Sequence, residues 1–186
     1  PAQFLDPNKK DASSSNIIYS KDHDKSWQSS PSAIENGGEA QVVELANGTL
    51  MLNMRSNRKA RLVSITRDMG ATWETHPSSA LSLRESGCQA SLINTTLKSH
   101  GKSIPVLFFS NPDNTSKRSD MTIKASLDQG ETWPSGLQVR LNENTGYGYS
   151  CMTMLDDHTI GIVYEGVREL FFQKINVSDI IGNIQK

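Results

Sequence analysis

Long hydrophobic runs are absent from this sequence, which contains no stretch of about 18 apolar residues that could cross a membrane as a helix. An excess of charge is absent as well, because Lys and Arg nearly balance Asp and Glu and leave a formal net charge of -1. Near neutrality argues against a nucleic-acid partner, whose binding requires a basic surface. Cysteine is scarce: Cys88 and Cys151 form neither a disulfide framework nor a Cys-x-x-Cys spacing. We therefore expect two small buried thiols and neither a bound metal nor a cofactor.

A short motif occurs three times, at residues 20–27, 66–73 and 126–133, and includes every tryptophan of the chain. Each copy follows a strand-like run. It places Ser or Thr first, Asp third, Ser or Thr seventh and Trp last. The fifth residue is Gly70 in the second copy and Gly130 in the third, but Asp24 in the first.

This repeat has the composition of a tight hairpin turn. Aspartate accepts hydrogen bonds from nearby backbone N–H groups in turns, and glycine adopts the positive φ that such turns require. The repeat therefore predicts strand, turn and strand, with the Trp ring packed back over the hairpin and its N–H bonded. Its role would be structural. The first copy, with Asp24 in place of glycine, is expected to be the least regular.

Strand-like runs separated by turn signals recur along the whole chain. The clearest hairpin surrounds Asn47-Gly48, a dipeptide typical of two-residue turns. Only residues 176–179 predict a helix, a short one with Ser178 as its cap. Many short strands joined by hairpins favour a radial propeller. Since one blade takes about 40–50 residues, the chain would supply roughly three and a half to four blades. The expected strands cover residues 17–19, 41–45, 49–54, 62–65, 91–93, 104–109, 121–124, 151–155, 160–164 and 170–175.

The repeat matches the Asp box, Ser/Thr-x-Asp-x-Gly-x-Thr/Ser-Trp, and the chain thereby resembles the sialidases. A glutamate, two arginines and a tyrosine follow in the order of that family, at Glu39, Arg55, Arg118 and Tyr149. The resemblance is to the bacterial exo-α-sialidases of glycoside hydrolase family 33 and covers essentially the whole chain. It implies an all-β fold, a six-bladed β-propeller, of which residues 1–186 would be the C-terminal part of the catalytic domain.

The resemblance assigns Arg55 and Arg118 to the arginine triad that holds the carboxylate of sialic acid. The guanidinium group suits this task because its planar fork of donors matches a carboxylate. An arginine at a strand end is, taken alone, more often a solvated surface residue, and Arg58 and Arg61 are nearby alternatives to Arg55. Gln89 resembles a residue at the rim of the site in bacterial members.

By the same resemblance Tyr149 is the nucleophile and Glu39 is the base that activates it. Sialidases depart from most retaining glycosidases in using Tyr, and an anionic nucleophile would be repelled by the substrate carboxylate. A phenol with a pKa of about 10 needs such a base. Tyr147 is the competing candidate, and the alternative for Tyr149 is a half-buried strand residue. Glu165 resembles the glutamate that orients the first arginine of the triad, although it could simply end a strand on the surface.

Two parts of the family's site have no match in this sequence: the first arginine of the triad and the acid/base aspartate. Asp6, Asp11, Asp22 and Asp24 precede Glu39, but they fall in the wrong blade and two lie in the repeat, so none is nominated. We therefore expect the N-terminal part of the same catalytic domain as a second chain, alongside a sialoglycoconjugate substrate. The resemblance implies a secreted, periplasmic or cell-surface protein.

The activity implied is hydrolysis of terminal sialic acid with retention through a tyrosyl-enzyme intermediate. Two alternatives stay open. A trans-sialidase, intermolecular or intramolecular, would share every residue named above. A non-catalytic Asp-box propeller acting as a binding module would share only the repeats.

Overall fold

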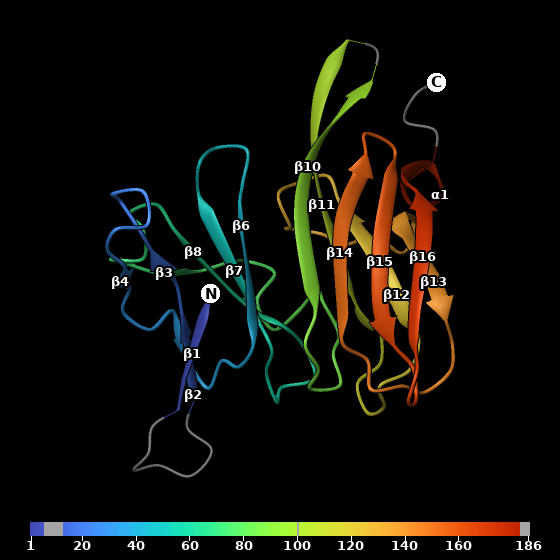
Figure 1. The fold of residues 1–186 in the computed structure, drawn as a ribbon, viewed down its shortest axis with the longest axis horizontal. Coiled ribbons are helices and arrows are strands. Elements are labelled where there is room, and N and C mark those ends of the chain that lie inside the picture. Colours follow the sequence, from blue (N-terminus) through green and yellow to red (C-terminus); the bar gives the residue numbers. More distant parts are fainter. Residues whose placement is uncertain (6–12, 100, 183–186) are drawn as a thin grey trace.

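The computed structural model describes residues 1–5, 13–99 and 101–182, and nearly all of them lie in antiparallel sheets or their turns (Figure 1). The N-terminal unit consists of two small sheets. One has the order β1-β2-β5 and the other pairs β3 with β4. Their strands are β1 (Ala2–Leu5), β2 (Ser13–Asn16), β3 (Ile18–Tyr19), β4 (Gln28–Ser29) and β5 (Ile34–Glu35).

Two four-stranded sheets and one three-stranded sheet follow, each with its strands side by side in chain order. The first contains β6 (Ala40–Glu44), β7 (Leu50–Met54), β8 (Leu62–Thr66) and β9 (Glu74–Thr75). The second contains β10 (Ser91–Ser99), β11 (Lys102–Pro112), β12 (Met121–Ser126) and β13 (Gln138–Asn142), with the short 3-10 helix η1 (Ser135–Leu137) before its last strand. The third contains β14 (Ser150–Asp156), β15 (Thr159–Glu165) and β16 (Leu170–Asn176), and the helix α1 (Val177–Ile181) follows it.

The sheets are arranged as successive blades. Strand β10 contacts both β6 and β14, so the first strand of each of the three later sheets lies innermost. Each junction between adjoining units has its own apolar core. Leu52 and Met54 pack at the first junction, Met51 and Phe109 at the second, and Ile162 at the third. Two complete blades flanked by two smaller units agree with the number of blades expected from the sequence.

The three repeats make the same side-chain hydrogen bonds, including the first, which was expected to be least regular. In the second copy Asp68 accepts the N–H of Thr72 at 2.9 Å and its hydroxyl at 2.6 Å, while the Thr66 hydroxyl accepts the N–H of Gly70 at 2.8 Å. Asp24 accommodates a positive φ of 65° where the other copies have glycine. The second and third copies add a backbone bond, from the N–H of Ala71 to the carbonyl of Asp68 and from that of Glu131 to Asp128. Among the described residues the first copy makes no such bond, so it is the least regular of the three, as expected, although its side-chain bonds are intact.

Trp73 packs backward onto the preceding unit, which the sequence did not predict. Its indole N–H donates to the carbonyl of Pro31 at 3.2 Å. Trp133 packs edge-on against Phe109 of its own sheet, with a centroid separation of 5.9 Å, in the apolar core shared with Met51 of the preceding sheet. Trp133 is buried, but its N–H has no partner among the residues that the structure describes. Trp27 is 59 % exposed, contrary to expectation, because the described part of the chain places no unit before its own.

Two smaller expectations were also wrong. Helix α1 begins one residue before Ser178, so Ser178 lies inside the helix, and Asn176 occupies the cap position without a side-chain bond. Cys151 is exposed instead of buried, although Cys88 is fully buried. Cys151 stands opposite Val163, which in turn stands opposite Phe172, on the outward side of the last sheet.

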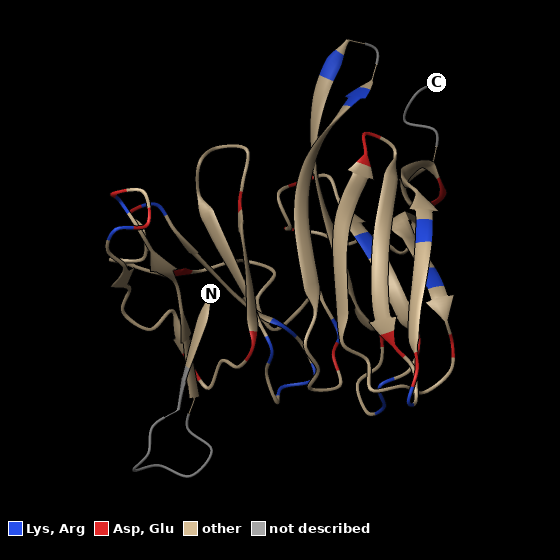
Figure 2. Ribbon diagram, in the orientation of Figure 1, with Lys and Arg blue, Asp and Glu red and all other residues tan. Residues whose placement is uncertain are grey.

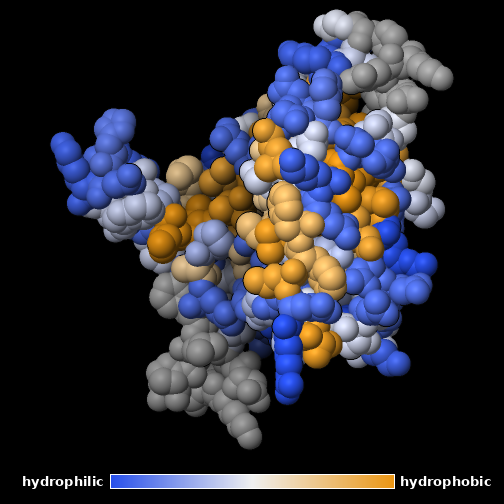
Figure 3. Space-filling view, turned by 45° about the vertical axis from the view of Figure 1, so that its right-hand side comes forward, coloured by the Kyte–Doolittle hydropathy of each residue, from blue (hydrophilic) through white to orange (hydrophobic). Residues whose placement is uncertain are grey.

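That outward side, which we call the open face, is apolar and has no neighbour in the described chain. Leu170 and Phe172 are 71 % and 59 % exposed there, beside the partly exposed Leu155 and Val163. Hydrophobic side chains gather on the C-terminal half of the molecule in Figure 3. A contiguous exposed apolar surface of this kind marks a site of association in soluble proteins.

The hydrogen bonds of the second repeat make stability depend on pH in a defined window. Bonds from Thr72 and then Thr66 lower the pKa of Asp68 from 3.8 to about 2. A carboxyl group whose pKa is lowered in the folded state stabilises the fold at pH values above 3.8, and this stabilisation is lost as the pH falls toward 2. We expect the melting temperature of Asp68→Asn in the complete propeller to fall less steeply between pH 4 and about pH 2 than that of the wild type. Asp157→Asn, on an exposed turn outside the repeats, is the control, and identical slopes for all three proteins would contradict this account.

Candidate active site

The residues that begin the innermost strands share one edge of the molecule. Glu39 precedes β6, Gln89 lies two residues before β10, and Tyr149 precedes β14. Arg55 follows β7 and Glu165 ends β15, and antiparallel pairing returns both to the same edge. Figure 2 shows that charged residues concentrate in the loops at this lower edge, whereas the strands above carry few.

Glu39, Arg55 and Tyr149 form a hydrogen-bonded trio at this edge. The Tyr149 hydroxyl donates to Glu39 Oε1, and Arg55 Nη1 donates to Glu39 Oε2 at 2.7 Å. Arg55 Nη1 also lies 3.4 Å from the Tyr149 oxygen. The Arg55 side chain is 30 % exposed and that of Glu39 is 34 % exposed, so solvent and small molecules can reach the trio. The structure thus brings together three residues that the sequence singled out.

The trio sets the protonation of its two acids. Partial burial alone would raise the pKa of Glu39, but the hydrogen bonds from Tyr149 and Arg55 outweigh it and hold the pKa below its usual 4.5. The same bond to Glu39, followed by partial burial, raises the pKa of Tyr149 above its usual 10.0. At neutral pH the trio therefore contains a carboxylate that accepts from a neutral phenol, which is the resting arrangement of a base and a hydroxyl nucleophile.

Arg118 lies against the ring of Tyr149, with its guanidinium carbon 5.7 Å from the ring centroid. Two of its nitrogens donate to backbone carbonyls, Nη1 to Tyr147 at 2.9 Å and Nη2 to Gly87 at 3.0 Å. These bonds fix the plane of the guanidinium beside the tyrosine. The sequence expectation that Arg118 and Tyr149 lie in one site agrees with this geometry.

Gln89 and Glu165 hold the backbone on each side of Tyr149. Gln89 Oε1 accepts the N–H of Ser150 at 3.0 Å, and Glu165 Oε2 accepts the N–H of Tyr149 itself at 3.2 Å. Gln89 was expected at the rim of the site and Glu165 beside an arginine. Both also fasten the start of β14 in the described chain, a task that only the tertiary structure reveals.

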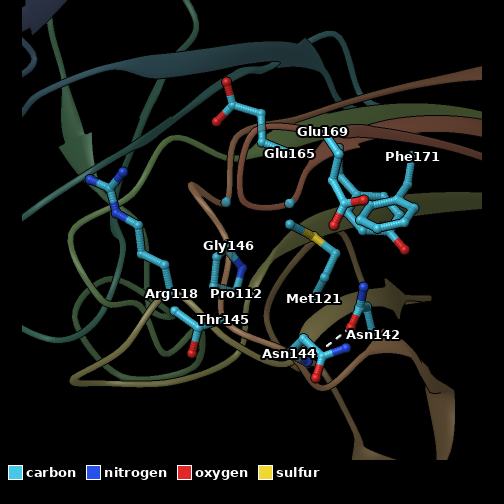
Figure 4. A pocket seen from close by; sticks show the side chains of 13 residues that line it. Pro112, Arg118, Met121, Asn142, Asn144, Thr145, Gly146, Glu165, Glu169 and Phe171 are labelled. Atoms are coloured by element: carbon cyan, nitrogen blue, oxygen red, sulfur yellow. Dashed lines mark hydrogen bonds between the residues drawn. The ribbon is translucent and has the colours of Figure 1, made fainter.

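Two hollows are lined by residues that bond to Tyr149. Glu39, Arg55 and Ser56 line an open one, and Arg118 and Glu165 line a smaller one. Figure 4 shows the smaller hollow, in which Arg118 and Glu165 extend away from the wall that contains Met121 and Phe171. Tyr149 links the two, because its hydroxyl bonds to Glu39 and its N–H to Glu165.

The alternatives named from the sequence lie elsewhere. Tyr147 is 50 % exposed, and its backbone carbonyl accepts a hydrogen bond from Arg118. Arg58 is exposed in a turn, and Arg61 is buried beneath the site in an ion pair with Glu85. The Arg61–Glu85 pair had no sequence signal, because the burial of both side chains depends on segments far apart in the chain. Asp22 and Asp24 lie in the first repeat, and Asp6 and Asp11 fall outside the described residues.

The comparisons with known proteins agree with this geometry. Residues 7–164 match the model of the BNR repeat-like domain. The chain belongs to this family. A sialidase of Bacteroides fragilis is 46 % identical over 183 residues, which are 97 % of this chain and 33 % of that protein. An anhydrosialidase of Macrobdella decora is 32 % identical over 89 % of this chain and 23 % of that protein.

Solved structures show the same relationship. A Hadza microbial sialidase superimposes with a TM-score of 0.84 at 47 % identity, over 91 % of this chain and 33 % of that one. The intramolecular trans-sialidase of Ruminococcus gnavus superimposes with a TM-score of 0.71 at 24 % identity, over 91 % of this chain and 38 % of that one, which supports the fold alone. The BNR chain is thus an all-β partial domain of the sialidase propeller type, as expected, and spans about a third of the length of its B. fragilis relative.

Neither a metal centre nor a membrane helix is visible in the part of the BNR chain that the structure describes. Within residues 1–5, 13–99 and 101–182, no three His, Cys, Asp or Glu side chains gather closely enough to hold a metal ion. Over the same ranges no helix is long and apolar enough to cross a bilayer.

Proposed function

We propose that this chain is the C-terminal part of an exo-α-sialidase catalytic domain, which removes terminal sialic acid from glycoproteins, glycolipids and oligosaccharides. The observation that carries the proposal is the trio in which the Tyr149 hydroxyl donates to Glu39 while Arg55 binds the same carboxylate. A neutral phenol paired with a base suits attack on a carbon that already bears a carboxylate. The relatives named as sialidases support the assignment.

In the proposed reaction the Tyr149 oxygen attacks the anomeric carbon of sialic acid while Glu39 accepts its proton. The bond from that carbon to the leaving oxygen breaks, and an acid supplied from outside this chain protonates the leaving group. Water then attacks the same carbon and gives a proton to the conjugate base of that external acid. The bond from the carbon to the Tyr149 oxygen breaks, Glu39 returns its proton to the tyrosine, and the configuration is retained overall. Arg55 and Arg118 hold the substrate carboxylate through charge-assisted hydrogen bonds. Glu165 and Gln89 keep Tyr149 in place.

The remaining parts of the site are proposed to come from the N-terminal blades of the same catalytic domain. These would provide the first arginine of the triad, beside Glu165, and the acid/base aspartate. We propose that the complete enzyme acts outside the cytoplasm, where sialoglycoconjugates are displayed. A fluorogenic sialoside incubated with the complete propeller tests the activity, and binding without turnover would instead favour a non-catalytic binding module.

Hydrolysis, trans-sialylation and intramolecular transfer share this site. The anhydrosialidase of Macrobdella decora and the intramolecular trans-sialidase of Ruminococcus gnavus are among the similar proteins, so the distinction is worth testing. We expect free sialic acid as the main product from 3'-sialyllactose, analysed by mass spectrometry and NMR in the presence of excess lactose. A dominant 2,7-anhydro product would indicate intramolecular transfer, and a sialylated acceptor would indicate trans-sialylation. Either result would contradict hydrolysis but leave the proposed roles of the residues unchanged.

Protonation of Glu39 should abolish its action as a base, so it should determine the pH below which kcat/KM falls. Because the pKa of Glu39 is held below 4.5, the base stays ionised at pH 5 and above and is lost only as the pH falls below that value. We expect Glu39→Gln to lower kcat/KM about 10²- to 10⁴-fold at pH 6, the usual contribution of a general base. The plot of kcat/KM against pH for this variant should also lack the decrease below pH 4.5 that the wild type shows. An unchanged rate in Glu39→Gln would contradict the role of this residue.

A further inference from the structure

The buried ion pair Arg61–Glu85 takes no part in the proposed reaction, yet it lies directly behind the site. Arg61 Nη1 is 2.8 Å from Glu85 Oε2, and the two side chains are 1 % and 0 % exposed. The ring of Phe109 covers the guanidinium at 5.7 Å. Such a pair contributes little net stability, because desolvation offsets the attraction and apolar replacements are often as stable. The bonds that the pair makes to its surroundings therefore matter more than its own energy.

One set of bonds fixes the backbone on both sides of Arg55. The second carboxylate oxygen of Glu85 accepts the N–H of Ser56, the residue that follows Arg55. Arg61 Nε donates to Asn53 Oδ1 at 2.7 Å, and Nη2 lies 3.4 Å from the Asn53 carbonyl. The end of β7 is held at residues 53 and 56, so the direction in which Arg55 leaves the strand is fixed.

The other set of bonds fixes the turn that holds Arg118. Arg61 Nη1 donates to the carbonyl of Cys88 at 2.9 Å. The preceding residue, Gly87, has a φ of 72° and accepts the bond from Arg118 Nη2. The following residue, Gln89, holds the backbone next to Tyr149. One buried pair thereby connects the segment that presents Arg55 with the turn that binds Arg118.

We propose that Arg61 and Glu85 are positioning residues, which set the spacing and orientation of Arg55 and Arg118 so that both guanidiniums meet one carboxylate. The inference rests on the proposed function, since that carboxylate is taken to belong to sialic acid. A lysine cannot take the place of Arg61, because a single ammonium group cannot reach Asn53, Glu85 and Cys88 with the fixed fork of a guanidinium.

The test uses the complete propeller and two variants, the double substitution Arg61→Met with Glu85→Leu, and Arg61→Lys alone. Dissociation constants are measured by calorimetry for free sialic acid and for its C1 carboxamide, which lacks the negative charge. Misplaced arginines should weaken the binding of sialic acid about 10- to 100-fold. Binding of the carboxamide should change little, so the preference for the carboxylate collapses. KM for a fluorogenic sialoside should rise in parallel.

Asp68→Ala provides the matched control, because it destabilises a hairpin remote from the site and should leave the carboxylate preference intact. A purely structural pair would likewise lower the melting temperature or the folded fraction without changing that preference. An unchanged preference for the carboxylate over the carboxamide in the folded variants overturns the positioning role. If the double variant does not fold, the result for Arg61→Lys decides the question. Failure of the wild type to bind sialic acid would instead defeat the proposed function, so the two failures are distinguishable.

Discussion

Tyr149→Phe in the complete propeller should lower kcat by about a thousandfold or more, the order of loss seen when a covalent nucleophile is removed, while sialic acid still binds. The substitution removes one oxygen, and the ring that packs beside Arg118 remains. The N–H that Glu165 accepts also remains, so the start of β14 should keep its place. Turnover of a fluorogenic sialoside and calorimetric binding of sialic acid together measure the effect.

Tyr147→Phe is the matched control for this experiment, because Tyr147 lies two residues away and its backbone carbonyl, which accepts from Arg118, is unchanged by the substitution. It should leave kcat within about twofold, as is usual for surface positions. Arg118→Ala should behave differently from both, with weaker binding as well as slower turnover. Equal binding losses in Tyr149→Phe and Arg118→Ala would contradict the division between nucleophile and carboxylate-binding residue.

Residues 1–186 expressed alone should be inactive on a fluorogenic sialoside, and activity should appear only when the N-terminal part of the domain is added. The open face of the last sheet leaves Leu170 and Phe172 in water, and Trp27 is exposed with no preceding unit in the described part of the chain. Both surfaces would be covered by the blades that close the ring. The separated chain should also aggregate or unfold more readily than the recombined protein.

The two cysteines report on this recombination directly. Cys151 is exposed on the open face and should react with iodoacetamide in the isolated chain but not after the missing blades have bound. Cys88 is the internal control, since it is fully buried and burial raises the pKa of its thiol to about 11, so it should stay unlabelled in both states. Activity of the isolated chain, or unchanged labelling of Cys151 in an active recombined protein, would overturn the proposed partner.

The hairpins of this protein could be predicted from the sequence because their determinants are local. Asn47-Gly48 sits between β6 and β7, and Gly70 and Gly130 adopt φ values of 83° and 87° in their turns. The candidate residues Glu39, Arg55 and Tyr149 were identified by family order, and the structure explains their meeting. Each lies where an inner strand, or its neighbour, reaches the same edge.

The rest could not be predicted, because it depends on which segments become neighbours. No residue near Arg61 in the sequence indicates that Glu85 is buried beside it in the fold. The exposure of Trp27 and Cys151 follows from the absence of an adjoining blade, not from their own motifs. The roles of Gln89 and Glu165 in holding β14 likewise arise from bonds across long sequence separations.

The contact between Tyr149 and Glu39 spans 110 residues of sequence, whereas nearly every strand pairs with the next one along the chain. Closing so long a loop is entropically unfavourable and slow compared with forming hairpins. The sheets should therefore take shape early during folding, and the tyrosine should meet its base only after three of them have docked. The hydrogen bond between the tyrosine and its base would then form last on the folding pathway. A newly synthesised chain would have no catalytic activity until its sheets have packed together.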